Sequence, residues 1–160
     1  MTSSTTDGAV IVVGYDGSPA SRAAVGFAAA RAGTTGKLIV VHAYDVPADY
    51  VGAPYYQDML DTKLTQANRV TEELGSMSAL DGIEWETDLV AGRPGPAICR
   101  AAEAREADEI VLGTRGHGRL RAVLGSVSAD VLHGAACPVV VIPSRMVEVA
   151  PEESADPAAI

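Results

Sequence analysis

The chain has 160 residues, which fits one domain with a sizeable buried core. Hydrophobic residues make up 48% and charged residues 21%, as in ordinary globular proteins. The net charge of −9 and the isoelectric point near 4.7 argue against duplex nucleic acid and anionic membranes as partners, because both are bound through basic surfaces.

Neither a signal peptide nor an apolar run of membrane-spanning length is visible, so we expect a cytoplasmic protein. Cys99 and Cys137 do not form a CxxC pair. We therefore expect two reduced thiols, with Cys137 packed in the core.

The first half of the chain predicts two buried strands around a helix. A β-branched run at 10–13 predicts the first strand, and residues 37–44 predict the second. Between them, Ser18 and Pro19 are a typical N-cap and first helical residue, and the helical pattern ends at Gly33. The segment 45–56, with two prolines and a glycine, predicts a loop.

The second half continues the alternation of helices and strands. Apolar residues at helical spacing predict a helix over 57–74, and alternating residues predict a strand over 83–90. After a break at 92–96, the pattern predicts a helix at 97–107, a strand at 108–112, a helix at 126–133 and a strand at 138–142. Residues 1–7 and the acidic tail 147–160 are expected to be disordered around a domain at 8–146.

This alternation predicts an α/β fold: a doubly wound, Rossmann-like, five-stranded parallel sheet with helices on both faces. Ligands of such sheets bind beyond the carboxyl ends of the strands, where the strand order reverses. Three segments that follow strands are expected to meet at that edge, namely 14–18, 42–45 and 113–118.

Two of these segments carry candidate binding groups. Asp16 could accept hydrogen bonds from a ribose or an adenine amine or help to hold a metal ion, but taken alone it is better explained as a turn residue that binds its own backbone. The glycines of Gly113-Thr-Arg-Gly116 and the helix start Gly125-Ser-Val-Ser128 indicate an anion site, because glycines and helix N-termini expose backbone N–H groups. Arg115, Arg119 and Arg121 add positive charge nearby; the alternative is a glycine-rich turn before an ordinary serine cap.

Several motifs, in this order, resemble those of the universal stress protein family over residues 8–144. They are Ile11-Val-Val-Gly-Tyr-Asp-Gly-Ser-Pro19, Val40-Val-His-Ala43, Val90-Ala-Gly-Arg-Pro94, Ile110-Val-Leu-Gly-Thr-Arg-Gly116, Leu124-Gly-Ser-Val-Ser128 and Cys137-Pro-Val-Val-Val-Ile142. The resemblance implies the adenine-nucleotide alpha-hydrolase-like version of the fold.

The resemblance to the ATP-binding branch of that family also implies roles for individual residues. Gly113 and Gly116 would contact phosphates and ribose, and the backbone at Ala43 and Leu112 would meet adenine and ribose. Asp16 would face the nucleoside. The phosphate chain would lie on Gly125, Ser126, Val127 and Ser128, and Gly14 and Arg115 complete the expected nucleotide site.

The chain departs from that branch in one loop. The family has nine residues between the second glycine and the Gly-Ser pair, whereas eight, His117–Leu124, lie between Gly116 and Gly125. Either Gly118 absorbs the missing residue, because glycine adopts backbone angles that other residues resist, or the Gly125 amides are displaced.

The leading hypothesis is a regulatory homodimer that binds ATP with Mg²⁺, with cyclic AMP as the alternative ligand. The family implies pairing through the strand Val139–Ile142, which we expect at a sheet edge. No catalytic constellation is visible, so any ATP hydrolysis should be slow. We expect His42 to pack, His117 to lie in solvent and His133 to suit the end of a helix. An interaction protein without nucleotide, a nucleotidyl transferase or hydrolase, and a flavin-binding protein remain alternatives.

Overall fold

The computed structural model of the protein describes residues 8–46, 53–114 and 124–143. Five parallel strands form one sheet in the order β3-β2-β1-β4-β5. The strands are β1 (Val10–Gly14), β2 (Lys37–Tyr44), β3 (Glu84–Ala91), β4 (Glu109–Gly113) and β5 (Val139–Ile142). The helices are α1 (Pro19–Ala32), α2 (Ala53–Glu72), α3 (Pro94–Ala104) and α4 (Ser126–Gly134), and two short 3₁₀ turns, η1 (Glu73–Ser76) and η2 (Ser78–Leu80), follow α2. The predicted fold class is confirmed.

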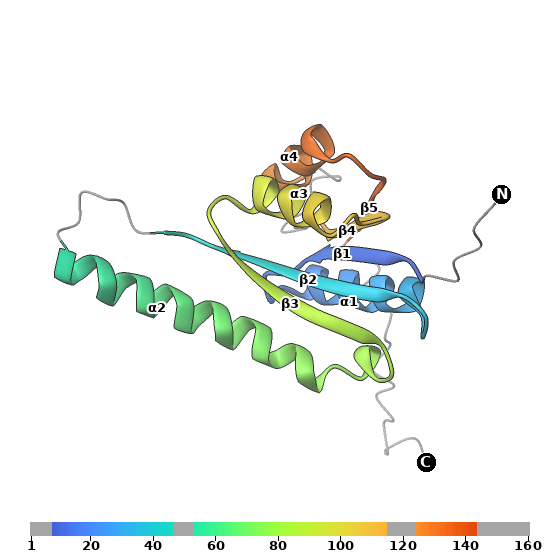
Figure 1. Ribbon diagram of the computed structural model, residues 1–160, viewed down its shortest axis with the longest axis horizontal. Coiled ribbons are helices and arrows are strands. Elements are labelled where there is room, and N and C mark those ends of the chain that lie inside the picture. Colours follow the sequence, from blue (N-terminus) through green and yellow to red (C-terminus); the bar gives the residue numbers. More distant parts are fainter. Residues whose placement is uncertain (1–7, 47–52, 115–123, 144–160) are drawn as a thin grey trace, which may run out of the picture.

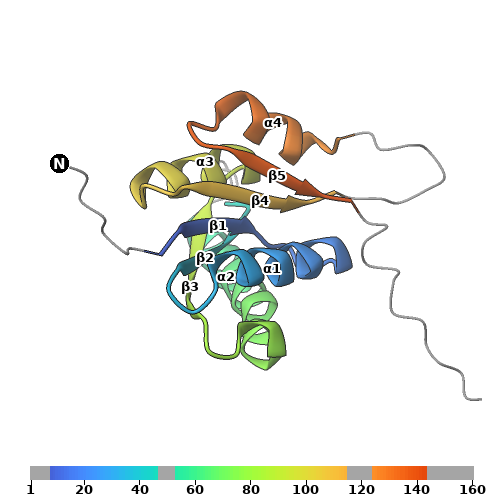
Figure 2. The same ribbon diagram turned by 90° about the vertical axis from the view of Figure 1, so that its right-hand side faces the viewer.

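The helices form a layer on each side of the sheet. Figures 1 and 2 show α1 and α2 on one face and α3 and α4 on the other. The central strands carry apolar side chains on both faces, as expected for parallel strands that are covered twice. Ile11 and Val13 of β1 point into the core under α1, whereas Val12 points into the core under α3.

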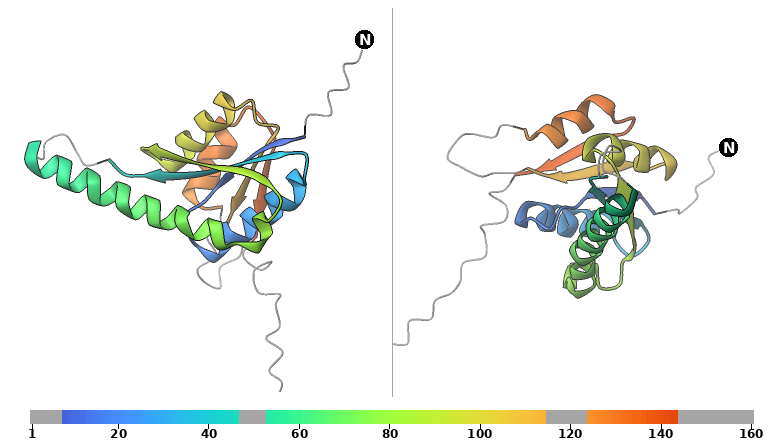
Figure 3. Two further views of the ribbon diagram at one scale, coloured as in Figure 1. Left: turned by 60° about the horizontal axis from the view of Figure 1, so that its bottom comes forward. Right: turned by 90° about the vertical axis from the view of Figure 1, so that its left-hand side faces the viewer.

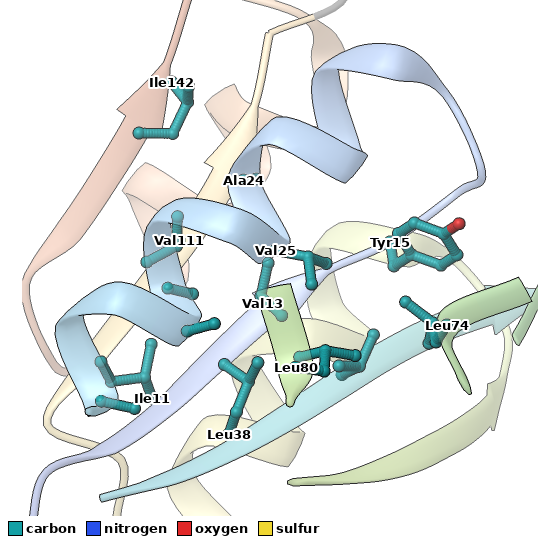
Figure 4. Close-up of a cluster of buried hydrophobic side chains, with 14 residues drawn as sticks. Ile11, Val13, Tyr15, Ala24, Val25, Leu38, Leu74, Leu80, Val111 and Ile142 are labelled. Carbon is teal, nitrogen blue, oxygen red and sulfur yellow. The ribbon is translucent and has the colours of Figure 1, made fainter. Parts of the chain in front are cut away.

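The core under α1 and α2 extends to the carboxyl end of β1. Figure 4 shows the ring of Tyr15 beside Leu74, which comes from the turn after α2. Tyr15 is 3% exposed, and its N–H donates to the carbonyl of Val41 at 2.9 Å. The residue that follows β1 is thereby fixed by the core on one side and by β2 on the other.

The start of α1 follows the predicted local rules. The hydroxyl of Ser18 accepts a hydrogen bond from the N–H of Ser21 at 3.2 Å, and Pro19 is the first helical residue. The helix ends before Gly33, whose φ of 60° favours glycine. At this end, Arg31 forms two hydrogen bonds with the carboxylate of Glu109, which holds α1 against β4.

The strands lie where predicted, with bounds that differ by at most one residue, but several helix bounds were wrong. The predicted loop 45–56 gives way to α2 at Ala53, and the predicted break at 92–96 gives way to α3 at Pro94. Prolines had suggested loops, yet the first helical turn needs no N–H donors and therefore accepts proline.

Two helices also end earlier than predicted. α3 stops at Ala104 because Glu106 adopts a φ of 50°, in the left-handed region, which the sequence pattern over 97–107 does not reveal. α2 stops at Glu72, and η1 continues the chain in a tighter 3₁₀ turn through Leu74.

The helix α2 is packed only along part of its length. Figures 1 and 3 show its N-terminal half reaching past the sheet. Tyr55 is 70% exposed, whereas Ala67 in the other half is buried. Within the described ranges, none of the helices is both long and apolar enough to cross a membrane. Residues 1–7 and 147–160, for which we predicted disorder, lie outside the described residues.

Candidate functional site

A cleft of about 320 Å³ opens beyond the carboxyl ends of β1 and β4, where the strand order reverses. This is the position that the fold class predicts for a ligand site, and the volume lies in the range of small-molecule sites. Every predicted site residue in the described part of the chain lines the cleft: Gly14, Asp16, Ala43, Leu112, Gly113, Gly125, Ser126, Val127 and Ser128. Arg115 and Gly116 lie outside the described residues, as do His117, Gly118, Arg119 and Arg121.

Other lining residues were not predicted as site residues. Pro94 and Ile98 reach the cleft from α3, and Ser21 reaches it from the third position of α1. The remaining lining residues are Tyr15, Ser18, Val41 and His42. Only the packing of α3 across the β1 end brings Ile98 here, so no local pattern could have identified it. Ser21, by contrast, lies one turn after the predicted cap Ser18 and could have been recognised.

The floor of the cleft is apolar and closely packed around Gly14. A Cβ atom at Gly14 would lie 2.8 Å from Leu112 Cδ2 and 2.9 Å from Ile98 Cδ1. The missing side chain therefore lets Leu112 and Ile98 meet across the end of β1. Together with Val41 and Pro94 they give the cleft an aliphatic wall on the α3 side.

Gly113 and Gly125 are glycines for different reasons. A Cβ at Gly113 would lie 2.4 Å from the carbonyl oxygen of Ala20, so the close approach of α1 to β4 requires glycine there. A Cβ at Gly125 would meet no described atom within 4 Å. The space at Gly125 thus opens toward the cleft, whereas the lack of a side chain at Gly113 is explained by the fold.

The three helix N-termini at this edge differ in the N–H groups that they offer. In α1, Ser18 caps the helix and Pro19 lacks an N–H. In α3, Pro94 and Pro96 lack N–H groups, and the N–H of Ala97 already binds the carbonyl of Arg93.

As far as the described residues show, the start of α4 retains its donors. Gly125 provides no side-chain cap, and the first helical hydrogen bond runs from the Ala129 N–H to the Gly125 carbonyl, at 3.0 Å. The N–H groups of Ser126, Val127 and Ser128 precede that bond and lie at the positive end of the helix dipole. The end of the cleft at α4 is therefore suited to an anion.

Among the described lining residues, Asp16 has the acidic side chain. Its carboxylate accepts a hydrogen bond from the N–H of Ser18 at 3.0 Å, as a turn residue would. The same side chain is exposed at the mouth of the cleft. The structure thus confirms the turn role of Asp16 and leaves its carboxylate within reach of a ligand.

The end of β2 presents main-chain groups to the cleft. The ladder between β1 and β2 ends at the pair Gly14–Val41. The N–H and C=O of one residue point to the same side of a strand, and this side alternates from residue to residue. The main-chain groups of Val41 face β1, so those of Ala43, two residues later, face the same side. Ala43 lies beyond the last pair of the ladder. One donor and one acceptor of Ala43 are therefore directed into the cleft.

Leu112 contributes differently from what the resemblance implied. The N–H of Ile110 binds the carbonyl of Pro138, and the N–H of Thr114 binds that of Ile142. By the same alternation, the main-chain groups of Leu112 belong to the ladder with β5. Leu112 therefore reaches the cleft with its side chain, and at this end of β4 the main-chain groups that face the cleft are those of Gly113.

The histidine and cysteine side chains in the described part of the chain contact other parts of the fold. His42 Nδ1 lies 2.8 Å from the carbonyl oxygen of Tyr15, and His133 Nδ1 lies 2.8 Å from that of Ala129. Cys99 and Cys137 are free thiols; Cys99 is buried in the core cluster, whereas Cys137, which we expected in the core, is half-buried and packs against that cluster. Burial raises the pKa of both thiols, which keeps them protonated and unreactive near neutral pH.

No group of three or more potential metal ligands is found among residues 8–46, 53–114 and 124–143. A Mg²⁺ ion commonly binds through one or two carboxylates together with substrate phosphates and water. The cleft supplies one such carboxylate, that of Asp16 beside the start of α1.

Comparison with known proteins gives a consistent result. The model of the universal stress protein family matches residues 9–143. A universal stress protein of Thermus aquaticus is 41% identical over 135 residues, which cover 82% of this chain and 96% of that protein.

Solved structures of universal stress proteins have the same fold as this chain. The universal stress protein UspA from Lactobacillus plantarum superposes with a TM-score of 0.67 at 28% identity, over 84% of this chain and 97% of that one. A universal stress protein solved in complex with cAMP superposes with a TM-score of 0.55 at 29% identity, over 86% of this chain and 98% of that one.

Proposed function

Because this chain belongs to the universal stress protein family, we propose that it binds an adenine nucleotide in the cleft beyond β1 and β4. The observation that carries the proposal is the distribution of donors along the cleft. At the β2 side of the cleft lie the main-chain N–H and C=O of Ala43. At the opposite side lies the N-terminus of α4, which has no side-chain cap, and an aliphatic floor connects the two sides. The family member solved with cAMP supports the same class of ligand.

In this proposal the base is read by the backbone. The N–H of Ala43 donates to N1 of adenine, and its carbonyl accepts from the N6 amino group. The ring lies on the aliphatic wall formed by Val41, Ile98 and Leu112. Backbone recognition requires no particular side chain at position 43, which is consistent with an alanine there.

The phosphates then lie at the start of α4. The N–H groups of Ser126, Val127 and Ser128 would hold them, and Gly125 leaves room for their approach. We propose ATP with Mg²⁺ as the preferred ligand, since the α4 end offers several donors to a chain of phosphates and Asp16 can contact the metal at the mouth. Cyclic AMP is the alternative, with one phosphate on the same donors.

The proposed role is regulatory binding. In the described part of the chain, the histidine at the cleft is engaged with a carbonyl and Asp16 with a backbone N–H, so neither is positioned as a general base. We expect ATP hydrolysis that is slow or absent. Nucleotide occupancy would instead change the surface at the rim of the sheet.

We also propose a homodimer that pairs through β5. The two edges of the sheet differ in their protection. Along β3, Glu84 and Glu86 form ion pairs with Lys37, and Glu86 and Asp88 form ion pairs with Arg105. Charged side chains at a sheet edge disfavour pairing with another chain. The edge strand β5 is Val-Val-Val-Ile without a charge, and Leu132 on the adjacent helix is 46% exposed. An uncharged apolar edge favours pairing with a second copy.

Calorimetric titration of the full chain with ATP, ADP, AMP and cyclic AMP, each with and without Mg²⁺, tests the proposed ligand. We expect saturable binding with a dissociation constant below about 1 mM, which corresponds to roughly 4 kcal/mol of binding free energy. Affinity for ATP should rise with Mg²⁺, and affinity for AMP should not. The absence of saturable binding by all four nucleotides at millimolar concentration would instead support an interaction protein without nucleotide.

A further inference from the structure

The contact between His42 and Tyr15 lies at the point where the β1–β2 ladder ends. His42 Nδ1 and the carbonyl oxygen of Tyr15 are 2.8 Å apart, and the contact is partly buried. A carbonyl oxygen can only accept a hydrogen bond, so Nδ1 must carry the proton. The contact therefore selects the tautomer with Nδ1–H when the ring is neutral.

The same carbonyl has another natural partner. Along this ladder the N–H of Lys37 binds the Ala9 carbonyl, and the N–H of Tyr15 binds the Val41 carbonyl. If the pattern continued, the next bond would join the Ala43 N–H to the Tyr15 carbonyl. The ladder stops at Gly14–Val41 instead, and within the described ranges the Tyr15 carbonyl is engaged by the side chain of His42.

We infer that His42 is a positioning residue for base recognition: it holds the Tyr15 carbonyl and thereby keeps the Ala43 N–H available to a ligand. The inference rests on the proposed function of the cleft. His42 acts through Tyr15 and Ala43 and needs no contact with the base. It assigns the affinity for adenine partly to a side chain that is hydrogen-bonded to the protein's own backbone.

Tyr15 is suited to transmit this effect because it is fixed on its other side. Its ring is buried beside Leu74, and its N–H is bound by Val41. The orientation of its carbonyl is set by two contacts: the one with His42 at 2.8 Å, and a longer hydrogen bond of 3.3 Å from the Asp16 N–H, in the same peptide plane, to Ser21 Oγ. Without His42, the carbonyl can turn to accept a hydrogen bond from the Ala43 N–H, which extends the β1–β2 ladder by one bond. That N–H is then no longer available to donate to the adenine ring.

Two substitutions at position 42 and one elsewhere test the inference. His42→Ala removes the donor, and His42→Asn retains an N–H donor near the position of Nδ1. His133→Ala is the matched control, since His133 makes the same kind of bond to a carbonyl at the same 2.8 Å but lies on α4 outside the cleft lining. Each protein is titrated with Mg-ATP and with inorganic tripolyphosphate, which has no base.

We expect His42→Ala to weaken ATP binding about tenfold, the effect of one hydrogen bond, while tripolyphosphate binding stays within about twofold. His42→Asn should recover most of the affinity, and His133→Ala should match the wild type. Equal losses for ATP and tripolyphosphate, or wild-type ATP binding by His42→Ala, would overturn the inference.

A measurement without nucleotide separates this inference from the proposed function. The amide of Ala43 should exchange with deuterium at least about tenfold more slowly in His42→Ala than in the wild type, because it gains the Tyr15 carbonyl as acceptor. Nitrogen-15 spectra of the wild type should show a protonated Nδ1 on His42. If the wild type binds no nucleotide, the proposed function fails while these two results still decide the role of His42; unchanged exchange or a neutral ring protonated only on Nε2 would refute it.

Discussion

The substitution Gly125→Asp should separate phosphate binding from the stability of the fold. Gly125 is the N-cap of α4, with φ −62° and ψ 162°, and a Cβ there would meet no described atom within 4 Å. An aspartate therefore fits without strain and can cap the N–H groups that we propose for phosphate.

The two effects of this aspartate should have opposite signs. As an N-cap it should stabilise the protein by a few tenths of a kcal/mol relative to glycine, with about 0.3–1 kcal/mol more from the helix dipole. Beside a bound phosphate, about 5 Å away, its charge should cost about 1–3 kcal/mol for an effective dielectric constant between 20 and 80. ATP affinity should thus fall by about 5- to 150-fold while the melting temperature stays level or rises.

Calorimetry with ATP and with adenosine, together with thermal unfolding, measures both effects. Adenosine lacks phosphate, so its affinity should not change. Gly125→Asn controls for the cap without the charge. Gly75→Asp adds the same charge in open space at the 3₁₀ turn after α2, which does not line the cleft. If Gly125→Asp loses no more ATP affinity than Gly75→Asp, the phosphates do not lie at α4 and the argument is wrong.

Three further predictions concern packing, assembly and the thiols. Gly113→Ala places a Cβ against the backbone of Ala20 and should destabilise the protein by about 3 kcal/mol or more. Gly26→Ala, in open space on α1, should stabilise it by up to about 1 kcal/mol. Denaturant unfolding measures both variants, and equal stabilities would contradict the steric argument. Val141→Pro removes an N–H that faces away from β4 and should convert a dimer to a monomer in analytical ultracentrifugation, while Thr87→Pro at the outward side of β3 should not; a monomeric wild type would refute the β5 interface. Because burial raises the pKa of Cys99 and Cys137, their alkylation should reach its half-maximal rate at a higher pH than that of a free cysteine. The free energy of unfolding should fall as the pH rises above about 8.5, because the thiols of the unfolded chain ionise first. An alkylation profile identical to that of free cysteine would exclude the effect.

The sequence by itself determined most of the architecture. Buried β-branched runs, a serine cap with a following proline, and regular alternation specify a doubly wound parallel sheet, because these signals are local and depend on only a few neighbouring residues. The rim that carries the cleft followed as well, since the carboxyl ends of parallel strands share one edge. The helix bounds near Ala53, Pro94 and Glu106 did not follow, because proline occurs both in loops and in the first turn of a helix, and no local pattern marks a glutamate with positive φ.

Tertiary structure alone decided what each residue at the rim does. Gly113 and Gly125 look alike in the sequence, yet one is required by the backbone of α1 and the other faces open space. Strand register, which no local pattern encodes, turns the main chain of Leu112 toward β5 and that of Ala43 toward the cleft. The contact of His42 with the Tyr15 carbonyl likewise exists only because the β1–β2 ladder ends at Gly14–Val41 while β2 continues to Tyr44 beside β3, and that difference is set by how the whole sheet packs.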